Sequence, residues 1–239
     1  MAALAADGRK TIGVIGGMGP MATVDIFRKI ILCTDAAGDG GHIPVLVDNN
    51  TRIPDRTEAI MRGGPDPAPE LLRSAARLAG MGADLLLMPC NAAHYYYDAI
   101  RRSVAIPLLN MVEETAAEAA RLRLGRVGLL AVSGTLHAGL YDRAFAARNI
   151  RVLKPDEREQ EAVMTVVYAG VKAGNFAVDR SDFLALTRRL YAAGAEALVL
   201  ACTELPLLFA EWDVPGRVLD PALILARQGV LLAGGKLKQ

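Results

Sequence analysis

The 239-residue sequence has few aromatic residues and few cysteines, and neither sign of charge is in clear excess. Aromatic residues make up 5% of the chain and hydrophobic residues 52%, so the core must consist mainly of Ala, Leu, Val and Ile. The formal net charge is +1, without a basic block or an acidic tail, which predicts no binding to nucleic acid or to a membrane surface. This balance favours a soluble enzyme that acts on a small molecule.

The sequence also lacks membrane and secretion signals. No segment approaches the roughly 18 consecutive apolar residues of a membrane span. The segment 1–7 lacks the basic start and apolar core of a secretory signal. The three cysteines, Cys33, Cys90 and Cys202, are too few and too far apart for a disulfide framework. We therefore expect a cytoplasmic protein with reduced thiols.

Apolar runs of strand length alternate with helix-length segments along the chain. Strands are expected at 11–15, 43–47, 84–88, 107–109, 126–132, 150–153 and 197–200. This alternation predicts an α/β fold of parallel sheets joined by crossover helices. The pattern occurs twice and each copy ends in a cysteine, which predicts two similar domains. One would comprise 1–105 plus 215–239, because the final helix returns to the first half, and the other 106–214.

Cys90 and Cys202 each follow an apolar run and precede a hydrogen-bonding residue, Asn91 or Thr203. In parallel sheets, ligands bind at the carboxyl ends of strands. A thiolate placed there, at the start of a helix, is stabilised by backbone N–H groups. The alternative is that a cysteine is simply a small buried hydrophobe, which we expect of Cys33. The pair predicts two acid/base groups that move a proton across a carbon atom.

Two further segments leave alternatives open. Residues 17–22 match the loose dinucleotide pattern G-x-G-x-x-A, so nicotinamide binding competes with binding of a small carboxylate at the same turn. His94 could form a nucleophile pair with Cys90, although we expect it to cap a helix or to pack. The histidines show no metal-ligand spacing, so we predict no metal site.

Cations in two places could bind a substrate carboxylate. Arg52 or Arg56, in the polar loop 48–57, could provide a bidentate fork, although a solvated loop is the alternative. Lys172 is a second cation near a helix end, where its simplest role is to compensate the helix dipole.

Several blocks of the sequence match one family in one order. They are 12–20, Asn49-Asn50 with 53–57, 88–91, 113–115, 170–175 and 202–204. On these blocks the chain resembles the cofactor-independent aspartate/glutamate racemase family, and most closely its aspartate racemases. The resemblance runs nearly end to end, and a series of this length is highly specific.

The resemblance implies an isomerase of two domains related by a pseudo-twofold axis, each with a parallel four-stranded sheet flanked by helices. The active site would lie in the cleft between the domains, with Cys90 and Cys202 as catalytic bases and no pyridoxal phosphate, metal or other cofactor. The implied substrate-binding residues are Met18, Asn50, Arg56, Asn91, Ala92, Ser133, Gly134, Thr135, Lys172, Thr203 and Glu204. Family members are commonly homodimers.

The implied reaction is the interconversion of L- and D-aspartate, with glutamate as a second candidate. The sequence departs from the family at Ala92, where Thr is usual, and at Ala201, where Gly is usual. A hydrogen bond to a charged group contributes about 1.5–3 kcal/mol, so the lost hydroxyl predicts slower turnover or a different substrate. The runner-up is a related isomerase or decarboxylase of maleate- or malonate-type dicarboxylates. A nicotinamide-dependent dehydrogenase and a catalytically silent amino-acid-binding protein are further alternatives.

Overall fold

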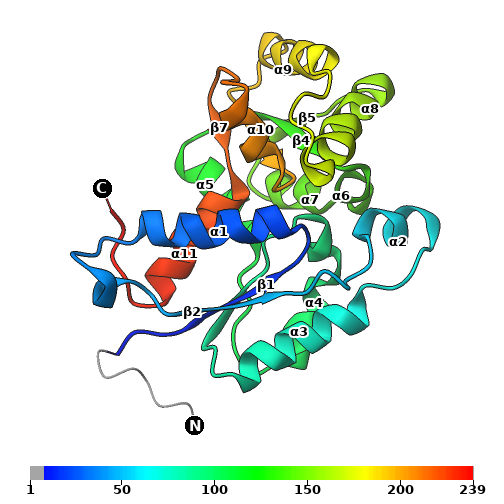
Figure 1. Ribbon diagram of the computed structural model, residues 1–239. Helices are drawn as coiled ribbons and strands as arrows, with labels where there is room; N and C mark the ends of the chain where they lie inside the picture. Colours follow the sequence, from blue (N-terminus) through cyan, green and yellow to red (C-terminus); the bar gives the residue numbers. More distant parts are fainter. Residues whose placement is uncertain (1–7, 239) are drawn as a thin grey trace.

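The computed structural model describes residues 8–238 and arranges them around two sheets (Figure 1). Residues 1–7, which the sequence predicts to carry no secretory signal, lie outside this range. The first sheet has the strand order β2–β1–β3 and the second has the order β5–β4–β6–β7. Every pairing within the two sheets is parallel, which confirms the expected α/β class.

The first half of the chain builds the first sheet and its helices. Its elements are β1 (Ile12–Gly16), α1 (Pro20–Cys33), η1 (Asp39–Gly41), β2 (Val45–Asn49), α2 (Arg56–Arg62), α3 (Ala68–Gly80), β3 (Leu85–Leu87), η2 (Ala92–Tyr96) and α4 (Tyr97–Ser103). All residues of β1 and β3 are buried, as expected of parallel strands that are covered on both faces.

The second half repeats this arrangement with longer helical connections. Its elements are α5 (Met111–Arg121), β4 (Arg126–Ala131), α6 (Ser133–Ala138), α7 (Leu140–Ala146), β5 (Arg151–Leu153), α8 (Glu157–Thr165), η3 (Val166–Gly170), η4 (Val171–Ala173), α9 (Ser181–Ala192), β6 (Ala197–Ala201), α10 (Leu205–Glu211), β7 (Val218–Leu219) and α11 (Pro221–Leu232). A capping box of Asp156 and Glu159 starts α8, and η3 continues it as a π-helical turn.

The first sheet has three strands, so the prediction of four strands in each sheet is wrong for this half. The expected strand 107–109 is reduced to an isolated parallel bridge between Leu108 and Leu86. The physical reason lies at Asn110, whose side chain accepts the N–H groups of Val112 and Glu113 and so starts α5 directly after the bridge. If the bridge at Leu108 is counted as a fourth strand beside β3, the strands of each sheet follow the same order: second, first, third and fourth along that half of the chain.

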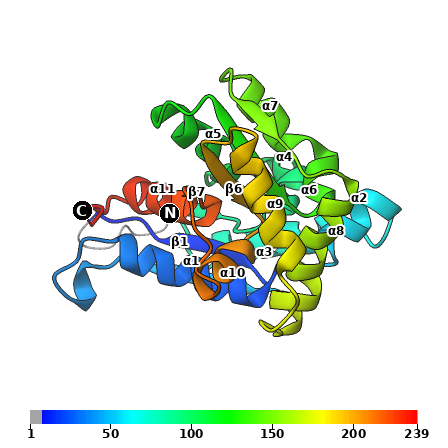
Figure 2. The ribbon, with the colours of Figure 1, turned by 90° about the horizontal axis from the view of Figure 1, so that it is seen from above.

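The last helix returns to the first half of the molecule. Asp220 caps α11 and Pro221 occupies its first turn, and α11 then packs against α1 and α5. Figure 2 shows α1 and α11 together at one end of the molecule, with α2, α6 and α8 at the other. The division into two domains remains a prediction. Because β7 pairs with β6, the chain leaves the second sheet after Leu219 rather than at residue 215.

One apolar cluster connects the two sheets. It includes Leu86 and Met88 from the first half, Leu198 from the second, and both Cys90 and Cys202. The cysteines therefore lie within a core that both halves share. Within residues 8–238, no helix combines the length and the apolar character that crossing a membrane requires.

Candidate active site

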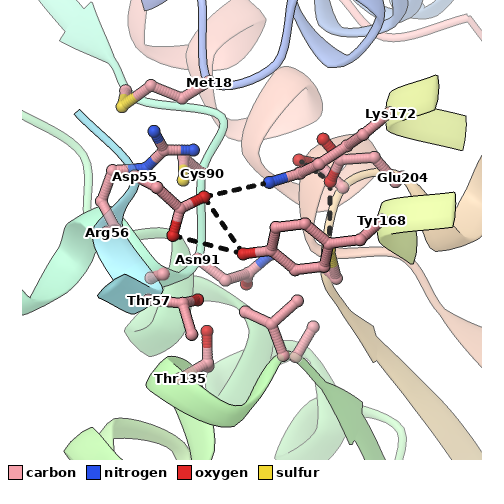
Figure 3. A pocket seen from close by; sticks show the side chains of 15 residues that line it. Met18, Asp55, Arg56, Thr57, Cys90, Asn91, Thr135, Tyr168, Lys172 and Glu204 are labelled. Carbon is pink, nitrogen blue, oxygen red and sulfur yellow. Dashed lines mark hydrogen bonds and ion pairs between the residues drawn. The ribbon is translucent and has the colours of Figure 1, made fainter. Parts of the chain in front are cut away.

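Cys90 and Cys202 both line one pocket, and Figure 3 shows this pocket with Cys90 labelled. Cys90 follows β3, and Cys202 is the residue directly after β6. Both side chains are buried, and each comes from a different half of the chain. The pocket is lined by Met18, Asp55, Arg56, Thr57, Cys90, Asn91, Ala92, Val132, Thr135, Tyr168, Lys172, Ala201, Cys202, Thr203 and Glu204.

Cys202 is held in its thiol form. Its Sγ donates a hydrogen bond to Glu204 Oε2 at 3.0 Å. Burial raises the pKa of Cys202 well above its ordinary value, and the negative charge of Glu204 raises it further. Lys172 acts in the opposite direction without overcoming these effects. This thiol is therefore a proton donor at neutral pH.

Cys90 has a cation beside it instead of a carboxylate. Burial acts to lower the pKa of Arg56, but the charges of Cys90 and Asp55 outweigh burial and raise it. Cys90 thus lies beside the Arg56 cation, whereas Cys202 is hydrogen-bonded to the Glu204 carboxylate.

The backbone of Cys90 is anchored by a buried histidine. His94 Nδ1 lies 2.9 Å from the carbonyl oxygen of Cys90, and Nε2 accepts the N–H of Met111 at 3.0 Å. The Nε2 atom is an acceptor, so the ring is neutral and Nδ1 carries its proton. The expectation that His94 caps a helix or packs is confirmed, because the ring is buried and accepts the N–H of Met111, the first residue of α5.

An ionic cluster joins the halves at the outer end of the pocket (Figure 3). The Tyr168 hydroxyl donates to the Asp55 carboxylate at 3.1 Å, and Lys172 Nζ lies 3.6 Å from the same carboxylate. Lys172 also lies over the Tyr168 ring, 4.2 Å from its centre. Burial acts to raise the pKa of Asp55, but the Glu58 N–H and Lys172 outweigh it and lower the pKa.

Two hydrogen bonds join the halves at the deep end of the pocket. Tyr141, on α7, donates its hydroxyl to Asn91 Oδ1 at 2.6 Å. Thr203 donates its hydroxyl to the carbonyl oxygen of Pro89 at 3.2 Å. Tyr141, Asn91 and Thr203 are all at least 98% buried. The residues next to the two cysteines are therefore tied directly to one another.

Four buried polar atoms on the pocket walls have no hydrogen-bond partner within residues 8–238. They are Arg56 Nε, Asn91 Nδ2, Thr135 Oγ1 and Glu204 Oε1. Buried polar groups are nearly always paired, so a group left open calls for an explanation. Two N–H donors, a hydroxyl and a carboxylate oxygen together match a zwitterionic ligand that carries carboxylates and an ammonium group.

The structure brings together both predicted cysteines and most of the predicted binding residues. Those that line the pocket are Met18, Arg56, Asn91, Ala92, Thr135, Lys172, Thr203 and Glu204. Ala201, which replaces the glycine usual in the family, also lines it. Among residues 8–238, no group of three or more His, Cys, Asp or Glu side chains is arranged to hold a metal ion.

Three predicted residues do not line the pocket. Asn50 donates to Glu70 and Ser74, and its backbone lies against Gly17, where a Cβ would come within 2.3 Å of it. Ser133 instead accepts a hydrogen bond from Gln160 Nε2. Gly134 allows α6 to approach α2, because a Cβ there would lie 2.9 Å from Thr57 Cα. These three residues therefore support the pocket without lining it.

The residues that sequence reasoning did not assign to the site are Asp55, Thr57, Val132 and Tyr168. Asp55 and Thr57 flank Arg56 in the polar loop 48–57, so their place in this loop was the sequence signal that could have identified them as site residues. Tyr168 precedes Lys172 by four residues, a spacing that one helical turn brings together. Val132 directly follows β4, at the same edge of the sheet as Cys202.

An α/β protein with two parallel sheets and a polar pocket between them is the class that this fold and site define. The chain belongs to the Asp/Glu/hydantoin racemase family, whose model matches residues 15–229. It is therefore an isomerase of the racemase type.

Individual relatives agree with this membership. The chain is 25% identical to the broad-specificity amino-acid racemase RacX of Bacillus subtilis (strain 168), over 92% of this chain and 96% of the relative. It is 31% identical to the solved aspartate racemase of Picrophilus torridus, with a TM-score of 0.82 and 96% of both chains covered. A glutamate racemase from Francisella tularensis subsp. tularensis SCHU S4 shares the fold, with a TM-score of 0.64 at 18% identity over 94% of this chain and 80% of the other.

Proposed function

We propose that this protein interconverts L- and D-aspartate without a cofactor, by proton transfer between Cys90 and Cys202. The observation that carries the proposal is one pocket lined by both cysteines, with Arg56 beside Cys90 and Glu204 hydrogen-bonded to Cys202. Two cations, Arg56 and Lys172, line the same pocket. Their charges suit the side-chain carboxylate of an acidic amino acid better than an apolar side chain.

In the proposed reaction, the Cys90 thiolate removes the α-proton and the Cys202 thiol delivers its own proton to the opposite face. Cys90 ends as a thiol and Cys202 as a thiolate, and the reverse reaction uses them in exchanged roles. The electron pair left on the α-carbon delocalises into the α-carboxylate. The open N–H donor on Asn91 is placed to stabilise that charge, as in other sites that hold an oxyanion.

Exchange of the α-proton in D2O, followed by NMR with L- and D-aspartate, L-glutamate and no added cofactor, tests this proposal. The wild-type protein should introduce deuterium into both enantiomers of aspartate. Cys90→Ser and Cys202→Ser should each lose racemisation, while exchange starting from one enantiomer can survive. The matched control is Cys33→Ser, since Cys33 is buried at the end of α1 and does not line the pocket.

Racemisation at the wild-type rate by either of the first two variants would refute the two-thiol mechanism. Absence of exchange in the wild-type protein, with all of these amino acids, would refute the proposed reaction.

We further propose that the protein is a cytoplasmic homodimer. Its three cysteines are free, which suits a reducing compartment. Helix α1 supports the dimer, because Met21, Val24 and Leu32 are all more than half exposed on it. The opposite face of α1 is already buried against the core, so apolar residues lie on both faces of this helix, with Arg28 among them on the exposed one.

A further inference from the structure

The two carboxylate oxygens of Glu204 have different surroundings. Oε2 accepts a hydrogen bond from Cys202 Sγ at 3.0 Å and lies 3.5 Å from the hydroxyl oxygen of Thr203, which donates to Pro89. Oε1 is buried on the pocket wall without a hydrogen-bond partner in the described part of the chain. It lies beside the turn that starts α1, 3.2 Å from where a Cβ on Gly19 would stand. The Glu204 residue as a whole is 97% buried.

Burial acts to lower the pKa of Lys172 and the charge of Glu204 raises it, but in the described part of the chain no hydrogen bond reaches Oε1, which is therefore open to a donor from a ligand. Leaving a buried charged acceptor unpaired is costly, so an open acceptor on a pocket wall indicates a ligand that supplies an N–H or O–H group. The carboxylates of an acidic amino acid cannot do this, because they only accept hydrogen bonds. Its α-ammonium group carries three donors and the opposite charge.

The other carboxylate in the pocket is already occupied. Asp55 accepts from the Glu58 N–H at 3.0 Å and from Tyr168 at 3.1 Å, and it pairs with Lys172 at 3.6 Å. Its side chain is also 29% exposed, so water reaches it. Of the two acids, Glu204 is therefore the one with an open acceptor, and it is the one beside a cysteine.

We propose that Glu204 Oε1 binds the α-ammonium group of the substrate next to Cys202, so that the pocket selects α-amino dicarboxylates over dicarboxylates without an amino group. The inference rests on the proposed function and narrows its substrate class. It also places the α-carbon close to the sulfur of Cys202, because the same carboxylate contacts both.

The same contact affects the second thiol. The negative charge of Glu204 is one of the causes that raise the pKa of Cys202. A bound ammonium offsets that charge and so makes the thiolate of Cys202 easier to form. Cys202 needs this form when it acts as the base for the opposite enantiomer. The amino group of the substrate thus supports the reaction as well as the binding.

Calorimetric titration with two ligands tests the proposal. Racemic aspartate is used because turnover leaves its composition unchanged, and succinate is the same dicarboxylate without the amino group. The wild-type protein should bind aspartate more tightly than succinate. In Glu204→Gln the ratio of the two dissociation constants should fall by about tenfold or more, because an ion-paired hydrogen bond to the ammonium is lost. Retained succinate binding shows that the variant is folded.

Three further variants sharpen the comparison. Asp55→Asn should keep the preference for aspartate, since its carboxylate is not the proposed ammonium partner. Glu204→Asp keeps the negative charge but shortens the side chain by one methylene group. The preference for aspartate over succinate should therefore be reduced without being lost. Glu118→Gln is the remote control, because this acid pairs with Arg121 on α5 away from the pocket and should titrate like the wild type.

The proposal is overturned if Glu204→Gln keeps the wild-type preference, if both Glu204 variants weaken the two ligands equally, or if Asp55→Asn alone removes the preference. A wild-type protein that does not distinguish aspartate from succinate overturns it as well. These outcomes are separate from failure of the proposed function. A protein that prefers aspartate through Glu204 but exchanges no α-proton refutes the proposed reaction and leaves the proposed ammonium site standing.

Discussion

His94 makes the stability of this protein depend on pH in a way that one substitution isolates. Its ring is 97% buried and neutral, held between the Cys90 carbonyl and the Met111 N–H. Burial lowers the pKa of His94 from the ordinary 6.5 to about 4, although backbone hydrogen bonds with Cys90 and Leu109 act to raise it. Below pH 6.5 the unfolded chain therefore binds a proton at this position, while the folded protein does not.

The magnitude follows from that difference. The unfolded state binds more protons between pH 6.5 and about 4, so the free energy of unfolding falls as the pH is lowered through this window. At about 1.4 kcal/mol for each pH unit, the loss from this residue amounts to about 3 kcal/mol. His94→Asn removes the titrating group and should remove this part of the pH dependence, whatever its cost in stability at neutral pH.

Urea unfolding, followed by circular dichroism at a series of pH values, measures the effect. Between pH 7 and pH 4 the wild type should lose about 3 kcal/mol more than His94→Asn. His137→Asn is the matched control, because His137 is exposed on α6 and its replacement should leave the wild-type profile unchanged. Parallel profiles for the wild type and His94→Asn would refute the assignment of His94 as a buried neutral ring.

Two further predictions concern the pocket and the oligomer. Tyr141→Phe leaves Asn91 Oδ1 as an unpaired buried acceptor, a cost of about 1–3 kcal/mol. We expect kcat for racemisation to fall by roughly five- to 150-fold with the circular dichroism spectrum retained, and an unchanged kcat would remove this hydrogen bond from the catalytic site. Val24→Asp puts a charge on the exposed face of α1, where Val24 is 60% exposed, and should convert the proposed dimer to monomer in light-scattering measurements. An unchanged mass would show that α1 is not the interface.

The architecture could be predicted from the sequence, because buried parallel strands are continuous apolar runs and such runs are easily recognised in this chain. Ile12–Gly16 and Ala197–Ala201 are of this kind. The short elements were less predictable. Val218–Leu219 pairs along only two residues, and Leu108 makes a single bridge, so in each case the neighbouring caps and turns decide whether a strand forms.

The candidate site was predictable where a residue follows a strand, as Cys90 and Cys202 do. It was less so where the position depends on how helices pack. Ser133 directly follows Val132, which lines the pocket, but the Ser133 hydroxyl accepts a hydrogen bond from Gln160 of α8. Tyr168 reaches Asp55 from a π-helical turn, which has no distinctive pattern in this sequence. The cations Arg56 and Lys172 were predictable from the sequence and from the resemblance to a family, but Asp55, which pairs with Lys172, was not.

The hydrogen bonds that join the two halves differ in burial, and this difference bears on how a ligand enters. The free space beside the cysteines is about 20 Å³, enough for a water molecule but not for an amino acid. The contacts of Asp55 with Tyr168 and Lys172 are partly exposed, whereas the Tyr141–Asn91 and Thr203–Pro89 bonds are buried. Water competes for the partly exposed contacts, so we expect these to separate when a ligand enters and the buried bonds to persist. Admission of a ligand would then leave the residues next to Cys90 and Cys202 in place.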